Sequence, residues 1–420
     1  MENINITWSG LAQLNSDEYI VIDIRDKMTF DFGHVPEAVN IRQEEFDSDF
    51  EKVKQSLSDM QGINNKLFVI MCVRGEISVE IANKLNENGF KAVSFEGGYN
   101  KWLVDKLNNE IAQSQINETE KSAGEDIAAD VDVQEGKPNK KKKKELTRTE
   151  QIELSIRKKF HKQLFSKFAK AINEYELVKE GDSIAVCISG GKDSMLMAKL
   201  FQELKRHNKF EFEVKFLVMD PGYSEYNRQI IENNAKILGI PIEIYESDIF
   251  DAVFNVEKSP CYLCARMRRG HLYKKAKEMG CNKIALGHHY DDVIETILMG
   301  MLYGAQVQTM MPKLHSTNFE GMELIRPMYL IREDDIKHWR DYNGLNFIQC
   351  ACKFTDTCTT CNSDGTNKSK RQEVKQLIAK MKETNPFVES NIFKSVENVN
   401  IDTVVAYKKK GVKHTFLEEY

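Results

Sequence analysis

Short apolar runs of strand length alternate with amphipathic stretches along most of the chain. In the first quarter, Tyr19–Arg25 and Lys66–Cys72 are apolar runs that predict buried strands, while Ile77, Ile81 and Leu85 fall on one helix face. Strands that alternate with helices favour a parallel sheet. The N-terminal part of the chain is therefore predicted to be an α/β domain.

The same alternation returns in the second half of the chain. It predicts a second α/β domain, doubly wound, with helices on both faces of a parallel sheet. The predicted strands lie near 183–188, 213–219, 241–246 and 283–287, and the predicted helices near 194–204, 227–238, 265–279 and 291–302.

Between these two regions the hydrophobic periodicity stops. Residues 111–150 are rich in Ser, Asn, Glu and Asp, and Lys140–Lys144 is an unbroken run of lysines. Such a composition buries too little apolar area to offset its chain entropy, so it predicts a flexible linker. The lysine run is either a solvated spacer or a tether for RNA phosphates. The expected organisation is domain 1–110, linker 111–150, domain 151–390 and C-terminal extension 391–420.

Composition and charge narrow the class of protein. With 420 residues, 41% hydrophobic and 29% charged, the chain is long enough for two or three globular domains. No apolar run approaches the roughly 18 residues of a membrane span, and Met1 leads into Glu2 without a signal sequence. We expect a cytoplasmic protein without a membrane partner.

The charge is unevenly distributed. Residues 1–110 hold 11 Lys and Arg against 19 Asp and Glu, and residues 151–420 hold 40 against 36. A mildly basic C-terminal half is the expected side for any nucleic acid. Nine cysteines, four of them within 350–361, indicate metal or sulfur chemistry rather than disulfides.

A first candidate site lies where a predicted strand ends at Cys72-Val-Arg-Gly-Glu-Ile-Ser78. Backbone N–H groups in a loop that enters a helix favour negative charge, so a cysteine there is biased toward the thiolate. Arg74 adds a cation and Gly75 permits a tight turn. A small buried hydrophobic cysteine is the alternative interpretation.

Three further segments occur with this loop in the order of the rhodanese family. They are Asp23-Ile-Arg25, Gly33-His-Val-Pro-Glu-Ala38 and Gly97-Gly-Tyr-Asn-Lys-Trp102. The chain resembles that family over nearly all of 5–107. The resemblance implies that Cys72 accepts sulfane sulfur as a persulfide, from thiosulfate or a cysteine desulfurase, and that the loop amides and Arg74 cradle it. Glu76 adds a negative charge and leaves the preferred donor open.

A second candidate site is the glycine turn within Ile184-Ala-Val-Cys-Ile-Ser-Gly-Gly-Lys-Asp-Ser194. Two glycines allow close approach to an anion, and a helix that begins there supplies N–H donors. The spacing differs from a Walker loop, which disfavours a kinase. The predicted phosphate cradle consists of Ser189, Gly190, Gly191, Lys192, Asp193 and Ser194.

This run resembles the PP-loop of ATP pyrophosphatases, which adenylate a carbonyl oxygen and release pyrophosphate. Gly287-His-His-Tyr-Asp-Asp292 also follows a predicted strand and begins a helix. Carboxylates there suit Mg²⁺ on the nucleotide phosphates. The resemblance implies Gly287 and Asp292 as nucleotide-site residues, with Lys192 and Asp292 in catalysis.

Cysteines form the third candidate site. Cys261-Tyr-Leu-Cys264 precedes a helix, and Cys350, Cys352, Cys358 and Cys361 follow at a distance. A C-x-x-C pair serves zinc, iron–sulfur clusters and dithiols alike. A structural zinc on the four distal cysteines is one alternative. Cys187 and Cys281 lie at core strand positions and are expected to be inert.

Four blocks together resemble the tRNA 2-thiocytidine synthetase group over roughly 155–385. They are the PP-loop, residues 260–270, residues 285–292 and Met311-Pro-Lys-Leu314. The resemblance implies a [4Fe–4S] cluster on three cysteines with one iron free of protein ligands. Cys261 and Cys264 match directly. Arg371-Gln372 selects Cys361 as the third ligand, with Cys358 and Cys350 as rivals.

The expected function is that of an ATP-dependent tRNA sulfurtransferase. ATP would adenylate the C2 oxygen of a pyrimidine, and sulfur relayed from Cys72 would replace it, with ATP, Mg²⁺ and the cluster as cofactors. Cytidine 32 follows from the resemblance, and thiouridine formation is the alternative. An amine-transferring PP-loop enzyme and a zinc-stabilised RNA-binding or sulfur-storage protein are the other hypotheses, and a homodimer is left open.

Overall fold

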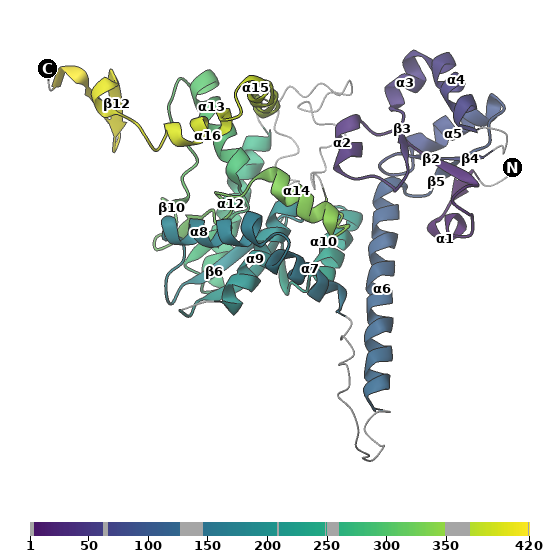
Figure 1. Ribbon diagram of the computed structural model, residues 1–420, viewed down its shortest axis with the longest axis horizontal. Helices are drawn as coiled ribbons and strands as arrows, with labels where there is room; N and C mark the ends of the chain where they lie inside the picture. The colour runs from purple at the N-terminus through teal and green to yellow at the C-terminus, as the bar shows by residue number, and fades with distance from the viewer. Residues whose placement is uncertain are drawn as a thin grey trace, which may run out of the picture.

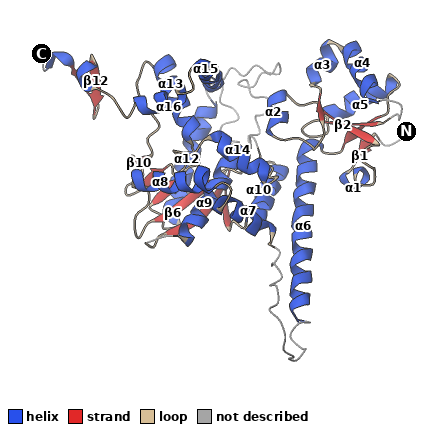
Figure 2. Cartoon of the chain, viewed as in Figure 1, coloured by secondary structure: helices blue, strands red, loops and turns tan. Residues whose placement is uncertain are grey.

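Two α/β domains make up most of the computed structural model, as Figures 1 and 2 show. Each contains a sheet whose strands are nearly all parallel, which confirms the fold class expected from the alternating pattern. The structure describes residues 4–61, 66–126, 146–207, 210–247, 249, 260–348, 370–418 and 420.

The N-terminal domain is a five-stranded parallel sheet in the order β1-β5-β4-β2-β3. Its strands are β1 (Asn5–Ile6), β2 (Tyr19–Asp23), β3 (Val39–Asn40), β4 (Leu67–Met71) and β5 (Ala92–Phe95). Its helices are α1 (Trp8–Leu11), α2 (Lys27–Phe32), α3 (Gln43–Ser48), α4 (Phe50–Gln61), α5 (Ile77–Glu87) and α6 (Gly98–Asp126).

The period of two along β4 explains how this sheet is covered. Phe68 and Ile70 join a buried cluster with residues of α3, α4 and α5. Val69 and Met71 belong to a different cluster, which includes residues of α1 and α6. Because neighbouring side chains of a strand point to opposite faces, helices bury both faces of the sheet.

The C-terminal domain contains a six-stranded sheet in the order β10-β11-β9-β6-β7-β8, in which only β10 and β11 pair antiparallel. Its strands are β6 (Ser183–Ile188), β7 (Glu213–Asp220), β8 (Ile242–Glu246), β9 (Lys283–Ala285), β10 (Lys313–His315) and β11 (Glu323–Ile325). Its helices are α7 (Arg148–Arg157), α8 (Ser166–Glu174), α9 (Lys192–Arg206), α10 (Glu225–Leu238), α12 (Pro260–Glu278), α13 (Tyr290–Gly304), α14 (Glu333–Tyr342), α15 (Lys370–Thr384) and α16 (Val388–Ser395), with a π-helical turn at His161–Phe165.

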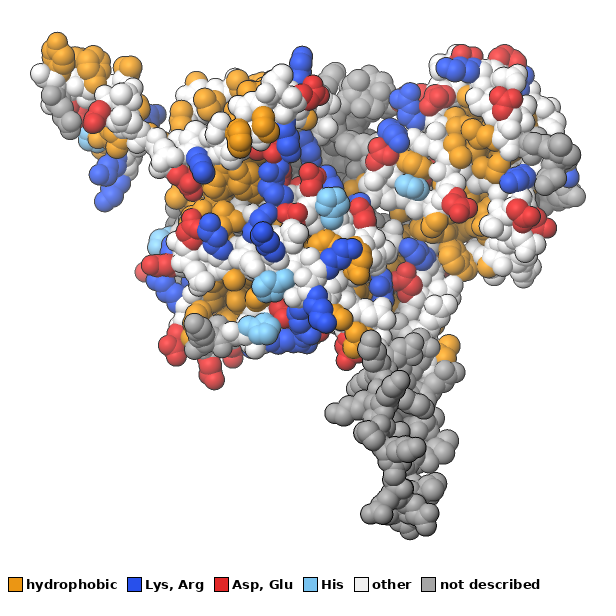
Figure 3. Space-filling view, viewed as in Figure 1, with side chains coloured by type: hydrophobic (Ala, Val, Ile, Leu, Met, Phe, Trp, Pro, Cys, Tyr) orange, Lys and Arg blue, Asp and Glu red, His pale blue; other side chains and the backbone are white. Residues whose placement is uncertain are grey.

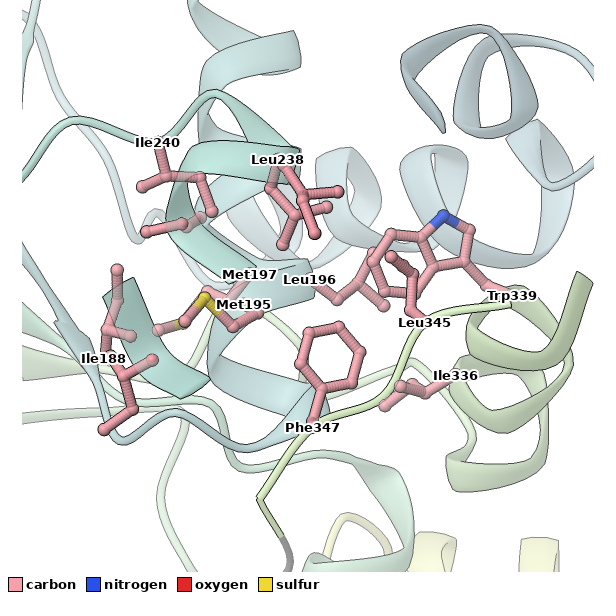
Figure 4. Close-up of a cluster of buried hydrophobic side chains, with 14 of the residues drawn as sticks. Ile188, Met195, Leu196, Met197, Leu238, Ile240, Ile336, Trp339, Leu345 and Phe347 are labelled. Atoms are coloured by element: carbon pink, nitrogen blue, oxygen red, sulfur yellow. The ribbon is translucent and has the colours of Figure 1, made fainter. Parts of the chain in front are cut away.

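The core of this domain lies directly beneath the glycine turn. Figure 4 shows Met195, Leu196 and Met197 of α9 among Ile188, Trp339 and other buried side chains. The opposite face of the sheet packs against α12 through a separate cluster that contains Tyr273 and Ala276. Apolar packing on both sides therefore fixes the position of the loop that joins β6 to α9.

The region predicted as a linker differs from that expectation at both ends. Helix α6 continues to Asp126, and α7 begins at Arg148 after a Thr147 capping box. Residues 112–126 contain no proline and only one glycine, so a solvent-facing helix can form there without an apolar stripe. The rest of the predicted linker, including Lys140–Lys144, lies outside the described residues.

Beyond α16 the chain ends in a separate two-stranded antiparallel sheet of β12 (Ala406–Lys409) and β13 (Val412–Thr415). Short 3₁₀ helices flank it at Ile401–Thr403 and Phe416–Glu418. Figure 1 shows this hairpin projecting from the body on the side away from the N-terminal domain. None of the helices in the described part of the chain is long and apolar enough to cross a membrane.

Candidate functional site

The Cys72 loop connects β4 to α5 at the carboxyl edge of the N-terminal sheet. Cys72 is buried, and the Gly75 N–H donates to its Sγ at 3.0 Å. The Ser78 hydroxyl lies 3.2 Å from the same sulfur and 2.8 Å from the Ser94 hydroxyl. The sulfur therefore sits in a polar cradle at a helix entrance, where backbone donors favour a negative charge.

Two glycines allow the loop at Gly97–Gly98 to approach the Cys72 loop closely. Gly98 has φ +62°, and a Cβ there would lie 2.5 Å from the Cys72 carbonyl oxygen. Gly75 has φ +88°, and its Cβ would meet the Gly97 backbone nitrogen at 2.7 Å. The Tyr99 N–H donates to the Cys72 carbonyl at 2.8 Å, so the start of α6 holds the cysteine loop.

Other residues of the predicted rhodanese pattern support the loop at a distance from the sulfur. Asp23 binds Arg25 through two side-chain nitrogens, and Arg25 also donates to the Gly33 carbonyl at 2.8 Å. The Arg25 guanidinium lies 3.7 Å from the centre of the Tyr99 ring. Arg74, the predicted cation of the cradle, is exposed.

The glycine turn after β6 forms the corresponding loop of the C-terminal domain. Gly190 has φ +85°, and a Cβ there would lie 2.5 Å from Ile231 Cγ1. The Ser189 N–H donates to Ser194 Oγ at 3.1 Å, and Gly191 is the N-cap of α9. The backbone turn and the helix N-terminus thus face the same space, as a phosphate cradle requires.

Lys192 is buried and lies within an ionic network. Its Nζ lies 3.1 Å from Asp193 Oδ2 and 3.3 Å from Glu333 Oε1 of α14. Lys375 of α15 donates to the other Glu333 oxygen at 2.6 Å. Burial alone would raise the pKa of Glu333, but Lys192 and Lys375 hold it far below the ordinary value. Glu333 could not be predicted from the sequence, because no local motif marks it.

The segment after β9 lies beside the glycine turn. A Cβ on Gly287 would be 3.2 Å from the Ser194 backbone nitrogen, so the two loops touch. Asp292 Oδ2 accepts from the His289 N–H at 3.0 Å, within the capping box of α13. Burial, helped by the Arg326 cation, lowers the pKa of His288 to about 4, which makes that ring neutral at pH 7.

A second residue that the sequence analysis missed binds the Asp292 carboxylate. Arg371, near the start of α15, lies 2.6 Å from Asp292 Oδ1 and 3.3 Å from Glu295 Oε2. Burial would raise the pKa of Asp292, but His289, His288 and Arg371 outweigh it and lower that pKa. In the sequence, the Arg371-Gln372 pair indicates only the position of the distal cysteines, through the family resemblance.

A cavity of about 330 Å³ is lined by five of the predicted nucleotide residues, whereas Gly190, Gly191 and Lys192 are not part of its lining. It opens at the carboxyl ends of the central strands, where ligands bind in doubly wound sheets. Buried Asp193 Oδ1 accepts no hydrogen bond from the described residues, and His289 Nε2 is 4.0 Å away. The lining includes Ser189, Asp193, Ser194, Gly287, His288, Asp292, Tyr223 and Arg268.

The predicted cysteine ligands are only partly described. Cys261 and Cys264 occupy the first turns of α12. Cys350, Cys352, Cys358 and Cys361 lie outside the described residues. Burial raises the pKa of Cys187 to about 12 and also raises that of Cys281, as expected for inert thiols.

The two domains contact each other at two places, where α6 packs against α10 and where α14 meets the end of α2. Asn233 of α10 donates to the Asn108 side chain of α6 at 2.9 Å, and the buried core is continuous between these helices. Arg340 of α14 donates to the Phe32 carbonyl at 3.0 Å. The two domains are therefore in direct contact, in addition to being joined by the chain between α6 and α7.

Family models agree with this division of the chain. A rhodanese-like domain matches residues 10–105, and a PP-loop domain matches residues 160–355. The fold and the two loops therefore define a PP-loop enzyme that carries a rhodanese-like domain.

Similar proteins narrow the class further. A tRNA-cytidine(32) 2-sulfurtransferase from Burkholderia multivorans is 32% identical over 280 residues, 65% of this chain and 80% of that protein. The protein of the same name from Syntrophotalea carbinolica is 35% identical over 233 residues, 55% of this chain and 86% of that protein. The chain belongs to the tRNA-cytidine(32) 2-sulfurtransferase family.

Among solved structures, the chain is similar to the U34-tRNA thiolase NcsA from Methanococcus maripaludis with its [4Fe–4S] cluster. The identity is 21% and the TM-score 0.45, covering 57% of this chain and 80% of that one.

Proposed function

We propose that the chain is an ATP-dependent tRNA sulfurtransferase that replaces the C2 oxygen of cytidine 32 with sulfur. One observation carries the proposal: Lys192, Asp193 and Asp292 gather around the glycine turn, and both carboxylates line one cavity of about 330 Å³. Membership of a family whose members carry that name supports the choice of tRNA and cytidine.

The first chemical step is adenylation. The C2 oxygen of the base attacks the α-phosphorus of ATP, and pyrophosphate leaves. Lys192 and the N–H groups at the start of α9 stabilise the charge that develops on the leaving pyrophosphate. A sulfur nucleophile then attacks C2, and AMP departs with the former carbonyl oxygen.

The carboxylates of the cavity fit a magnesium ion. Asp193 offers a buried oxygen that accepts no hydrogen bond from the described residues, and the lowered pKa of Asp292 keeps that group ionised. Hard oxygen donors and nucleotide phosphates are the ligands that Mg²⁺ prefers. Asp193 and Asp292 would hold the ion, which when bound neutralises phosphate charge.

Cys72 supplies the sulfur. Its thiolate takes the outer sulfur of thiosulfate, a bond between Sγ and that sulfur forms, and sulfite leaves. A cysteine desulfurase would load the same persulfide. Release of this sulfur at the oxidation level of sulfide takes two electrons, which a thiol reductant provides.

A [4Fe–4S] cluster on Cys261, Cys264 and Cys361 completes the proposal, with Cys358 or Cys350 as alternatives for the third ligand. When bound, it supplies an iron site for sulfur chemistry. Anaerobically purified protein should contain about four iron and four sulfide per chain, and Cys261→Ser should remove them. Stoichiometric zinc without iron would contradict the cluster.

The test of the function is nucleoside mass spectrometry of unmodified tRNA after incubation with the protein, ATP, Mg²⁺, a reductant and sulfide. We expect 2-thiocytidine and pyrophosphate in equal amounts. 2-Thiouridine would redirect the proposal to the other pyrimidine, and ATP turnover without a thiolated nucleoside would overturn it.

A further inference from the structure

The C-terminal hairpin differs from the rest of this acidic chain in charge. The chain carries a net charge of −5, yet residues 406–415 contain four lysines and no Asp or Glu. Those lysines are exposed, and none forms an ion pair with a described residue. Figure 3 shows blue lysine side chains on one side of this arm, apart from the body, with hydrophobic side chains over its far end.

The register places like charges opposite each other. Lys408 pairs with Lys413 across the hairpin, while Tyr407 pairs with His414 and Lys409 with Val412. Directly opposed like charges destabilise an antiparallel pair, and a lone two-stranded hairpin is marginally stable in water. The local turn favours the hairpin, since Lys410 and Gly411 both have positive φ, at +50° and +84°. A polyanion bound here would relieve the repulsion.

The second face of the hairpin carries an aromatic pair. The Tyr407 and His414 rings stack with centroids 5.0 Å apart and an angle of 22° between their planes. Alternation along the strands puts Lys409 on the same face as Tyr407. An aromatic platform beside lysines is suited to nucleic acid, because bases stack on the ring while phosphates meet the cations.

We propose that β12 and β13 form a basic arm that binds the tRNA backbone outside the catalytic cavity. This inference rests on the proposed function for the identity of the RNA. A second copy of the chain is a poorer occupant, because two arms of like charge repel when they meet across a twofold axis. Exposed Val405, Phe416 and Leu417 beside the arm would favour a protein partner, which the experiment distinguishes.

The test replaces Lys408, Lys409, Lys410 and Lys413 with Gln in the full-length protein. A matched control replaces four exposed lysines of the two domains, Lys52, Lys91, Lys205 and Lys236, with Gln. Fluorescence anisotropy with labelled tRNA from 50 to 300 mM salt gives the affinity and its salt dependence. ATP affinity and sulfide-supported thiolation at saturating tRNA are measured in parallel.

We expect the arm variant to bind tRNA at least 10-fold more weakly. The slope of log affinity against log salt should fall by about 1 for each lysine that contacts a phosphate. ATP affinity and thiolation at saturating tRNA should stay unchanged, and the control should lose less than 3-fold. A tyrosine variant, Tyr407→Ala, should weaken binding without changing the slope.

Three results would overturn the inference. They are equal affinity and slope in the arm variant and the wild type, an equal loss in arm variant and control, and a change of oligomeric state in the arm variant with tRNA affinity intact. Failure of the proposed function looks different, because the wild-type protein would then produce no thiolated nucleoside at any tRNA concentration.

Discussion

The Cys72 loop and the glycine turn at Gly190 are built alike but differ in the group that their backbone N–H donors bind. Each follows a buried parallel strand, turns through a glycine at positive φ and leads into a helix. In the first loop, the chain itself supplies the acceptor, since the Gly75 N–H donates to Cys72 Sγ. In the second, the anion must arrive with the ligand.

The side chains around the glycine turn reflect this difference. Beside the glycine turn, Glu333 pairs with buried Lys192 at 3.3 Å. The Glu333 carboxylate therefore balances the charge of Lys192 when no phosphate is bound, since an unpaired buried charge is costly. The Cys72 loop needs no such substitute, because the sulfur that its backbone N–H binds is covalently part of the chain.

The largest effect should come from Cys72→Ala. Removing the sulfur acceptor should lower thiosulfate-dependent sulfur transfer by more than about 10³-fold. Thiolation supported by free sulfide should persist, because the glycine turn is untouched. Cys281→Ala, another buried thiol, is the control and should keep both activities. Full thiosulfate-supported thiolation in Cys72→Ala would show that the first loop is not the sulfur source.

The next largest effect should come from Lys192→Ala. Loss of a preorganised cation at the phosphates should reduce sulfide-supported thiolation by about 10²–10³-fold. Thiosulfate sulfurtransfer at Cys72 should be unchanged. Lys337 also pairs with Glu333, at 3.1 Å, but is half-exposed, so Lys337→Ala tests whether the network alone matters. Equal losses in both variants would contradict a direct role for Lys192.

Much of this comparison could be predicted from the sequence because both loops are local motifs. In each case the apolar run marks the end of a buried strand, and the glycines and the reactive or ligand-binding residues follow within a few positions. That the Gly190 and Gly287 segments belong to one site followed only from the family resemblance. The structure gives the physical reason, since β6 and β9 are neighbours in a parallel sheet and their carboxyl ends share one edge.

The residues that were missed come from elements far away in sequence. Glu333 begins α14 and Arg371 lies at the start of α15, and each meets the site only through tertiary packing. The helix over 111–126 was missed for a different reason. It carries no apolar stripe, and absence of hydrophobic periodicity was interpreted as absence of structure.

A third prediction tests whether both loops depend on close backbone approach. Gly190→Ala and Gly98→Ala each place a Cβ about 2.5 Å from another atom at positive φ. Strain and overpacking together should cost about 2–4 kcal/mol of unfolding free energy. Gly181 and Gly89 also have positive φ but open space, so alanine there should cost only about 1–2 kcal/mol.

Urea unfolding measures these costs. Tryptophan fluorescence and amide hydrogen exchange follow the unfolding of each domain. Trp102 reports on the N-terminal domain and Trp339 on the C-terminal domain. Equal costs at crowded and open glycines would mean that the conformation, and not the close approach, selects glycine in both loops.

The smallest effect should come from Glu333→Gln, which addresses the exchange of anions directly. Without this carboxylate, Lys192 and Lys375 lose a competing partner, so ATP phosphates should bind about 3–10-fold more tightly, the equivalent of roughly 0.7–1.4 kcal/mol. The protein without ATP should become less stable, since buried Lys192 and half-exposed Lys375 each lose an ion-pair partner. Thermal melting with and without ATP should therefore show a lower melting temperature and a larger ATP-induced rise.

The stabilising effect of Glu333 should depend on pH. The pKa of Glu333 is lowered in the folded protein from its ordinary value of 4.5, so its stabilising effect is complete above that value and disappears as the pH falls below it. The stability gap between wild type and Glu333→Gln should thus be constant near neutral pH and narrow below about pH 4.5. Asp335 lies on the same helix as Glu333 and pairs with Lys167 at 3.0 Å, so Asp335→Asn is the control and should leave ATP affinity unchanged. Weaker ATP binding in Glu333→Gln would mean that the carboxylate positions Lys192 for the phosphates instead of standing in for them.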